Sequence, residues 1–91
     1  MAMTKTTTIS WGSEEDQSNT NLDSARTAKI NEMVADGKTD GVWENINPVT
    51  TKRFWLNQSA AEEFVSFIVA QAELYQCTVV STLIEDYTAP V

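Results

Sequence analysis

The segment Ser59–Glu85, SAAEEFVSFIVAQAELYQCTVVSTLIE, contains the clearest secondary-structure signals in the chain. It opens with a capping box, Ser59 to Glu62, in which the hydroxyl and the carboxylate each satisfy a free backbone N–H at the start of a helix. Apolar residues then recur three, four and seven positions apart, which predicts a helix from Ser59 to Tyr75. The buried stripe of that helix would consist of Ala61, Phe64, Val65, Ile68, Ala72 and Tyr75.

The residues after this helix predict a strand from Cys77 to Glu85 with aliphatic side chains on both faces. Val79 and Leu83 lie on one face, and Val80 and Ile84 lie on the other. An antiparallel sheet with one face in water normally carries polar side chains there. We therefore expect something other than water to cover both faces of this strand.

Two further elements precede the centre of the chain. Alternating polarity and β-branched residues predict a strand over Thr4–Trp11, and composition predicts a loop over Gly12–Asn19. A helix is expected from Asn21 to Asp36, because Thr20 and Asp23 approximate a capping box and Gly37 is a typical residue just beyond a helix end. Its sheet-facing residues would be Leu22, Ile30, Met33 and Val34.

The central segment predicts a hairpin. Strands Val42–Ile46 and Thr51–Leu56 flank the turn residues Asn47 to Thr50, and a four-residue loop is common between paired strands. That loop places Glu44 opposite Arg53, where the opposite charges would attract. In this register Val42 and Trp55 share the face without helices, whereas Trp43, Phe54 and Leu56 point toward the helices.

The order of elements is β-α-β-β-α-β, which predicts an α+β fold of ferredoxin-like type. Right-handed connections would give a four-stranded antiparallel sheet with two helices on one face. Residues 1–91 are expected to form a single domain, with a folded core over 3–86 and a C-terminal tail over 87–91. The apolar content of 42% suits a folded chain of this length.

The charge composition argues against nucleic-acid and membrane partners. Thirteen acidic residues against six basic ones give a net charge of −7, whereas phosphate recognition depends on lysine and arginine. No run approaches the ~20 apolar residues of a membrane span. The single cysteine, Cys77, cannot form an internal disulfide, so we expect a cytoplasmic, intracellular protein and a buried, unreactive thiol.

The residue types needed for common catalytic chemistry are missing. The chain has no histidine, which is the commonest general base and metal ligand, and it has no phosphate-cradling glycine motif. The acidic run Glu14 to Asp16 lacks the alternating spacing of a calcium loop and is expected to be a solvated segment. We therefore expect no cofactor and no metal, and we expect a protein that is not an enzyme.

The leading functional hypothesis is an interaction or structural module that forms a homodimer. The copies would pair through the face of the sheet that carries no helix, which we expect to display Val42, Trp55, Val80 and Ile84. Two alternatives for covering this face remain open, namely the C-terminal tail and another ligand or protein partner.

A second hypothesis is a small-molecule-binding protein or a cofactor-free enzyme with a pocket between sheet and helices. Its candidate pocket residues, chosen by their expected facing, are Trp11, Arg26, Trp43 and Tyr75. Arg26 has two readings: a stem packed on apolar surface, or an anchor for a carboxylate or phosphate at the sheet edge.

Two resemblances extend these hypotheses. Residues 52–64, KRFWLNQSAAEEF, are similar to small uncharacterised proteins of tailed phages and marine metagenomes, which implies a viral protein that binds a host or virion component. The expected architecture and apolar open face resemble the dimeric α/β-barrel proteins, some of which are small monooxygenases or isomerases. That resemblance implies paired sheets and a pocket, and it transfers no catalytic residue to this chain.

Overall fold

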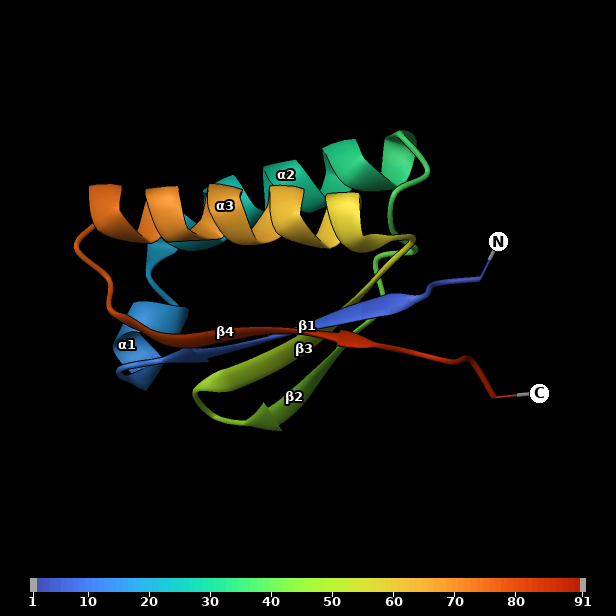
Figure 1. Cartoon of the computed structure of the whole chain (residues 1–91). Helices are drawn as coiled ribbons and strands as arrows, with labels where there is room; N and C mark the ends of the chain where they lie inside the picture. Colours follow the sequence, from blue (N-terminus) through green and yellow to red (C-terminus); the bar gives the residue numbers. More distant parts are fainter. Residues whose placement is uncertain (1, 91) are drawn as a thin grey trace.

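The computed structural model describes residues 2–90 and has two layers, with helices above a four-stranded sheet (Figure 1). The strand order is β2-β3-β1-β4, and every neighbouring pair is antiparallel. The two long helices, α2 and α3, lie side by side on one face of the sheet (Figure 1). The expected α+β architecture is therefore confirmed. The elements are β1 (Lys5–Trp11), α1 (Glu14–Gln17), α2 (Thr20–Ala35), β2 (Trp43–Asn47), β3 (Thr50–Trp55), α3 (Gln58–Leu74) and β4 (Val79–Asp86).

Both long helices begin slightly earlier than the capping-box pattern indicates. Asn19 caps α2 by accepting a hydrogen bond from the Leu22 N–H at 3.0 Å, and Asn57 caps α3 by accepting from the Ala60 N–H at 2.9 Å. An asparagine carbonyl one or two residues upstream competes with the Thr20 and Ser59 hydroxyls for the same free donors. The sequence pattern located each helix correctly and misplaced its cap.

The end of α2 forms as Gly37 predicts. This glycine has a positive φ of 72°, and its N–H donates to the Val34 carbonyl at 3.1 Å. The next N–H, of Lys38, donates to the Met33 carbonyl at 2.9 Å. These two hydrogen bonds make up a Schellman motif, which satisfies the last carbonyls of the helix.

The segment expected to be a loop, residues 12–19, contains the single-turn helix α1. The Ser13 hydroxyl caps it by accepting from the Asp16 N–H at 3.1 Å. The Asp16 carboxylate in turn accepts from the Thr78 N–H at 3.2 Å, which attaches this turn to the beginning of β4. The acidic run is thus held in place by its own backbone and by the last strand.

Trp55 is the centre of the core. The side chain is fully buried, its ring stacks on Phe64 of α3 at a centroid distance of 4.5 Å, and its indole N–H donates to the Thr7 hydroxyl at 2.9 Å. The expectation that Trp55 lies on the open face is wrong. A buried indole N–H needs an acceptor, and Thr7 on the helix side of β1 provides it.

The same correction applies to the neighbours of Trp55 in the sheet. Thr7 pairs with Arg53 on one side and with Ile84 on the other, so both of these side chains share the helix face. Ile84 is partly buried against the core and is not part of an open apolar face. Phe54 points the opposite way from Trp55, because side chains alternate along a strand.

Phe54 is covered by the beginning of the C-terminal tail. The Tyr87 ring lies edge-on to Phe54 at a centroid distance of 4.9 Å, and the Tyr87 N–H donates to the Thr4 carbonyl at 2.9 Å. The first residue of the expected C-terminal tail, Tyr87, thus contacts the sheet through both its ring and its backbone. Residues 1 and 91, which the expected domain includes, lie outside the described part of the chain.

The hairpin register matches the prediction only at its turn. Asn47 pairs with Thr50 as the expected loop requires, but a bulge at Ile46 shifts every earlier residue of β2 by one position. Trp43 therefore pairs with Arg53, and Glu44 pairs with Lys52. One extra residue in an edge strand exchanges the two faces of that strand, so the expected Glu44–Arg53 pair does not form.

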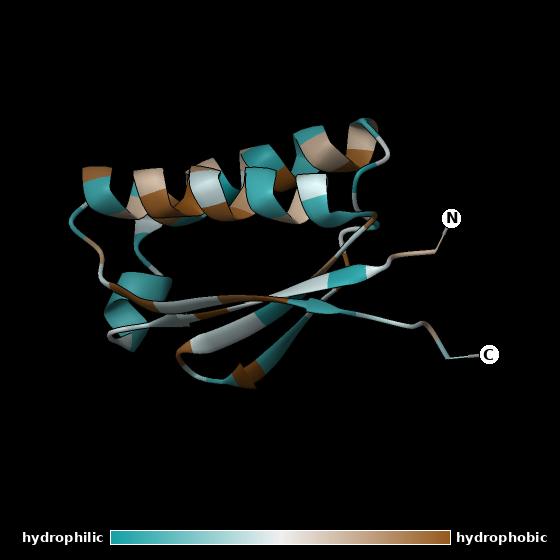
Figure 2. Ribbon diagram, viewed as in Figure 1, coloured by the Kyte–Doolittle hydropathy of each residue, from teal (hydrophilic) through white to brown (hydrophobic). Residues whose placement is uncertain are grey.

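The face of the sheet without helices is mainly polar, as an antiparallel sheet in water requires. Figure 2 shows hydrophobic residues concentrated in α3, with hydrophilic residues prominent along β2 and β3. Of the expected self-association face, Trp55 and Ile84 belong to the core. Val42 and Val80 are 53% and 66% exposed, but Val42 precedes β2 and Val80 lies in β4, the two opposite edge strands. The four residues therefore form no continuous surface.

An ion-pair cluster joins the two long helices. The Glu63 carboxylate of α3 accepts a hydrogen bond from Lys38 at 2.9 Å and lies 3.0 Å from the Lys29 ammonium of α2. The hydrogen bond from Lys38, followed by that from Lys29, lowers the pKa of Glu63 below its usual value.

Within residues 2–90, no helix combines the length and the apolar character that a membrane crossing requires.

The Thr7–Trp55 hydrogen bond should be essential to this core. Thr7→Val removes the one acceptor that the buried indole N–H has within residues 2–90, so we expect the free energy of unfolding to fall by about 1–3 kcal/mol. Chemical denaturation measures this loss. In a double-mutant cycle with Trp55→Phe, which has no N–H, the Thr7→Val step should cost much less. An equal cost in both backgrounds would show that the hydrogen bond is unimportant.

Candidate functional site

A groove runs between α2 and the edge of the sheet formed by β2 and β3. It consists of overlapping hollows that all share Arg26 of α2 and Arg53 of β3, the largest with a volume of ≈ 290 Å³. A narrow inner end reaches Thr7, Ile9, Trp11, Phe64 and Ile68 of the core. The outer part is lined by Gln17, Ser18, Asp23, Thr27, Ile30, Asn31, Gly41, Trp43, Asn45 and Thr51.

The groove exists because the two long helices contact the sheet differently. α3 packs on β1, β3 and β4, whereas α2 packs mainly against α3. Residues 23, 26, 27, 30 and 31 recur at helical spacing and turn one side of α2 toward β2. That side is polar apart from Ile30, so long charged side chains extend into a space that a second apolar helix face would have closed.

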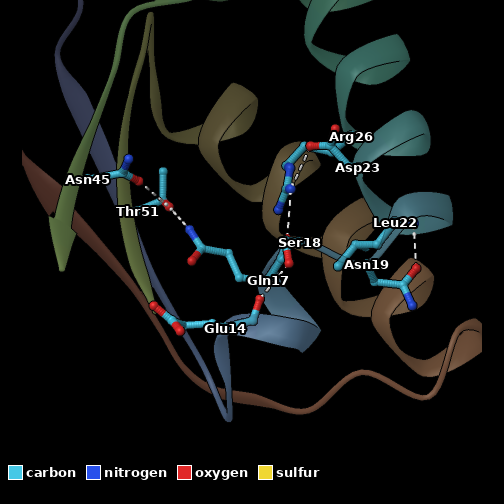
Figure 3. Close-up of polar contacts among 9 residues, drawn as sticks. All are labelled: Glu14, Gln17, Ser18, Asn19, Leu22, Asp23, Arg26, Asn45 and Thr51. Atoms are coloured by element: carbon cyan, nitrogen blue, oxygen red, sulfur yellow. Dashed lines mark hydrogen bonds and ion pairs between the residues drawn. The ribbon is translucent and has the colours of Figure 1, made fainter. Parts of the chain in front are cut away.

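Arg26 has a fixed position within the groove. Its Nη2 donates to the Asp23 carboxylate at 2.8 Å and to the Gln17 carbonyl at 2.9 Å, and only 13% of its side chain is exposed (Figure 3). Gln17 is the last residue of α1, so Arg26 connects the two helices. The packed stem agrees with the first sequence interpretation of Arg26. The guanidinium binds Asp23 and Gln17 of the same chain, and its role as an anchor for a ligand carboxylate or phosphate stays a prediction.

Arg53 lies on the helix face without a carboxylate partner. Within residues 2–90 its guanidinium makes no side-chain hydrogen bond or ion pair, and it lies 5.5 Å from the Trp43 ring centroid and 5.9 Å from that of Phe64. Burial, with the positive charge of Arg26 as a second cause, lowers the pKa of Arg53 to about 10. The group therefore stays charged at neutral pH, in surroundings that disfavour its charge.

A line of hydrogen bonds crosses the outer groove from α1 to the sheet edge. Gln17 Nε2 donates to the Thr51 hydroxyl at 2.6 Å, and Thr51 donates to the Asn45 side-chain oxygen at 3.5 Å (Figure 3). Figure 3 places the Arg26–Asp23 pair on one side of this area and the Gln17–Thr51–Asn45 line on the other. The groove thus has polar side chains from four elements around it, α1, α2, β2 and β3.

Three of the four expected pocket residues lie around this groove. Trp11 is buried at its inner end, Arg26 is shared by all parts of it, and Trp43 forms its outer aromatic wall with 52% of the residue exposed. Tyr75 does not take part: it caps the C-terminal end of α3 and packs partly buried against the core.

Sequence reasoning missed Arg53, because it assigned Arg53 and Trp55 to the open face. Residues 53 and 55 share a face whichever way the strand points. The signal on this strand is ambiguous, because Phe54 and Trp55 are both large and apolar and point to opposite faces. Placing Trp55 in the core would have brought Arg53 to the helix side.

Cys77 and the carboxylates, the other candidates for chemistry, do not form a second site among the described residues. Cys77 is buried, as expected, and burial raises the pKa of its thiol. Among the described residues, no three histidine, cysteine or carboxylate side chains gather closely enough to hold a metal ion. The groove remains the place where charged, aromatic and amide side chains converge.

The desolvated charge of Arg53 should lower the stability of the fold. Arg53→Met keeps a long stem and removes a desolvated charge, so we expect the free energy of unfolding to stay unchanged or rise by up to about 2 kcal/mol. Lys52→Met is the matched control, because it removes the same charge from the neighbouring residue on the other face. If Arg53→Met is destabilising relative to Lys52→Met in chemical denaturation, the ring contacts outweigh the burial.

No protein-family model, curated protein or solved structure matches this chain.

Proposed function

We propose that this chain is a small, non-enzymatic binding module whose ligand occupies the groove between α2 and the β2–β3 edge. One observation carries the proposal: Arg53 is a partly buried charge without a hydrogen-bonding partner in residues 2–90. Replacing a desolvated charge with an apolar side chain of similar volume is often neutral or stabilising for a fold. The presence of Arg53 beside an exposed tryptophan is explained by a ligand that completes its contacts.

We also propose that the fold is a ferredoxin-like arrangement elaborated by α1. Apart from α1, the elements follow the order β-α-β-β-α-β. The strand order β2-β3-β1-β4 with antiparallel neighbours is consistent with two interleaved β-α-β units. In such an arrangement β2 is an edge strand, and the groove lies where α2 extends over that edge.

This site favours the small-molecule-binding hypothesis over pairing through the open face of the sheet. A ligand site combines an apolar wall with a few convergent polar groups, and Trp43, Arg26 and Arg53 supply that combination here. The volume of ≈ 290 Å³ is at the lower end of the range for ligand sites, which suits a ligand of one ring or a short side chain.

A screen of small fragments by two-dimensional NMR tests the proposal without assuming the ligand's charge. We expect the fragments that bind to shift the signals of groove residues, above all the indole N–H of Trp43. Trp43→Leu should weaken these fragments, whereas Leu83→Ala, which alters another half-exposed apolar residue on β4, should not. Fragments that shift only residues outside the groove, or no binding fragment at all, would contradict the proposal.

A second candidate function is self-association through the β2 edge. Every residue of β2 is exposed, and three large apolar side chains lie on or beside it: Val42, Trp43 and Ile46 are each 52–53% exposed. An edge strand presents unpaired backbone groups, so a second copy could extend the sheet there. This surface differs from the face on which homodimer formation was first expected.

Light scattering coupled to size-exclusion chromatography checks this second candidate. We expect a dimer that dissociates in Ile46→Lys, because the added charge lies in the proposed contact. Leu83→Lys adds the same charge to β4 and should leave the dimer intact. A monomer at every concentration, or equal effects of the two substitutions, would remove the β2 edge as an interface.

A further inference from the structure

The charged side chains of the groove have a net positive charge, whereas the protein as a whole has a net negative charge. The chain carries a net charge of −7, yet the charged side chains lining the groove are Arg26, Arg53 and Asp23. Asp23 neutralises Arg26 through their 2.8 Å ion pair. One positive charge, on Arg53, is therefore left without compensation in the groove, and this charge matches a ligand with a single negative charge.

The N–H groups of Arg53 remain accessible for such a ligand. Every fully buried side-chain nitrogen or oxygen in residues 2–90 has a hydrogen-bond partner. Because the Arg53 guanidinium has none, its nitrogens are atoms that solvent still reaches. A guanidinium presents parallel N–H groups that fit the two oxygens of a carboxylate, and the low polarity around Phe64 and Trp43 strengthens that contact.

The polar groups in the same hollow add donors. Within residues 2–90, the Gln17 amide donates one N–H to Thr51 and its second N–H has no acceptor. The Asn45 oxygen faces the Thr51 hydroxyl at 3.5 Å, and the Asn45 NH₂ group has no acceptor among the same residues. A carboxylate accepts hydrogen bonds and donates none. A dianionic phosphate fits less well, because Asp23 lines this hollow and its exposed carboxylate would repel the second charge.

Trp43 indicates which chemical group carries the carboxylate of the ligand. Its ring contacts Arg53 and is half exposed along the outer groove, so it offers a flat apolar surface next to the guanidinium. A flat ring bearing the carboxylate would stack there while its oxygens reach Arg53. We infer that the groove binds an aromatic monocarboxylate, with Arg53 holding the carboxylate and Trp43 the ring. This inference rests on the proposed binding function.

Titration with sodium benzoate, followed by tryptophan fluorescence and by the Trp43 indole N–H signal, tests the inference. We expect binding with a Kd of order 1 mM, as suits a ligand of this size. Benzamide has the same shape without the charge and should bind at least about tenfold more weakly. Equal binding of benzoate and benzamide, tighter binding of inorganic phosphate, or no binding of benzoate at about 10 mM would overturn it.

Substitutions locate the carboxylate. Arg53→Met should weaken benzoate at least about tenfold, whereas Lys52→Met, with the same loss of charge on the other face, should change it less than about twofold. Equal losses would mean that only net charge matters and would overturn the assignment. If neutral fragments occupy the groove while benzoate does not, the binding function stands and the carboxylate inference fails.

The same carboxylate could belong to a free aromatic acid or to the C-terminal residue of a peptide. A short peptide ending in phenylalanine, compared with its C-terminal amide, separates these sources. Tighter binding of the free-acid peptide than of benzoate identifies a chain terminus as the ligand, and the reverse order identifies a small acid. Both results support the inferred chemistry. Equal binding of the peptide acid and the peptide amide contradicts it.

Discussion

The hydrogen bond from the Trp55 indole to the Thr7 hydroxyl determines which side of the sheet each residue occupies. A buried N–H without an acceptor is costly, so Trp55 can be in the core only if β1 presents Thr7 to it. With Trp55 facing α3, alternation along β3 fixes Arg53 and Thr51 on the same face. The two residues that give the groove its charge and its hydroxyl group are therefore positioned by a contact deep in the core.

The bulge at Ile46 has a second, independent effect on the site. Without it, the turn at Asn47 and Thr50 would put Glu44 opposite Arg53, and a carboxylate would neutralise the guanidinium. With it, Trp43 takes that place and its ring contacts the guanidinium face instead. One additional residue in an edge strand thus converts an ordinary cross-strand ion pair into an aromatic wall beside an uncompensated charge.

The sequence was sufficient to predict the four strands and the two long helices, because they depend on local patterns, but not the single turn α1. Capping residues, Gly37 and the apolar spacing of α3 indicated the long helices, and alternation indicated the strands. The facing of β3 was not predictable in this way, because Trp55 and Phe54 are both large and apolar and either could enter the core. The choice depends on Thr7, 48 residues away in the sequence, and on Tyr87 covering Phe54. The bulge at Ile46 has no sequence signal of its own.

The pairing of β1 with β4 makes the two ends of the chain depend on each other. β1 occupies the interior of the sheet, yet one of its neighbours is supplied by the last strand, so Lys5 pairs with Asp86 and Thr7 with Ile84. Contacts between residues so distant in sequence slow folding, because a long loop must close before they form. During synthesis, one edge of β1 therefore stays without its partner strand until residues 79–86 have left the ribosome. The native sheet consequently forms only when residues 79–86 are present to pair with β1.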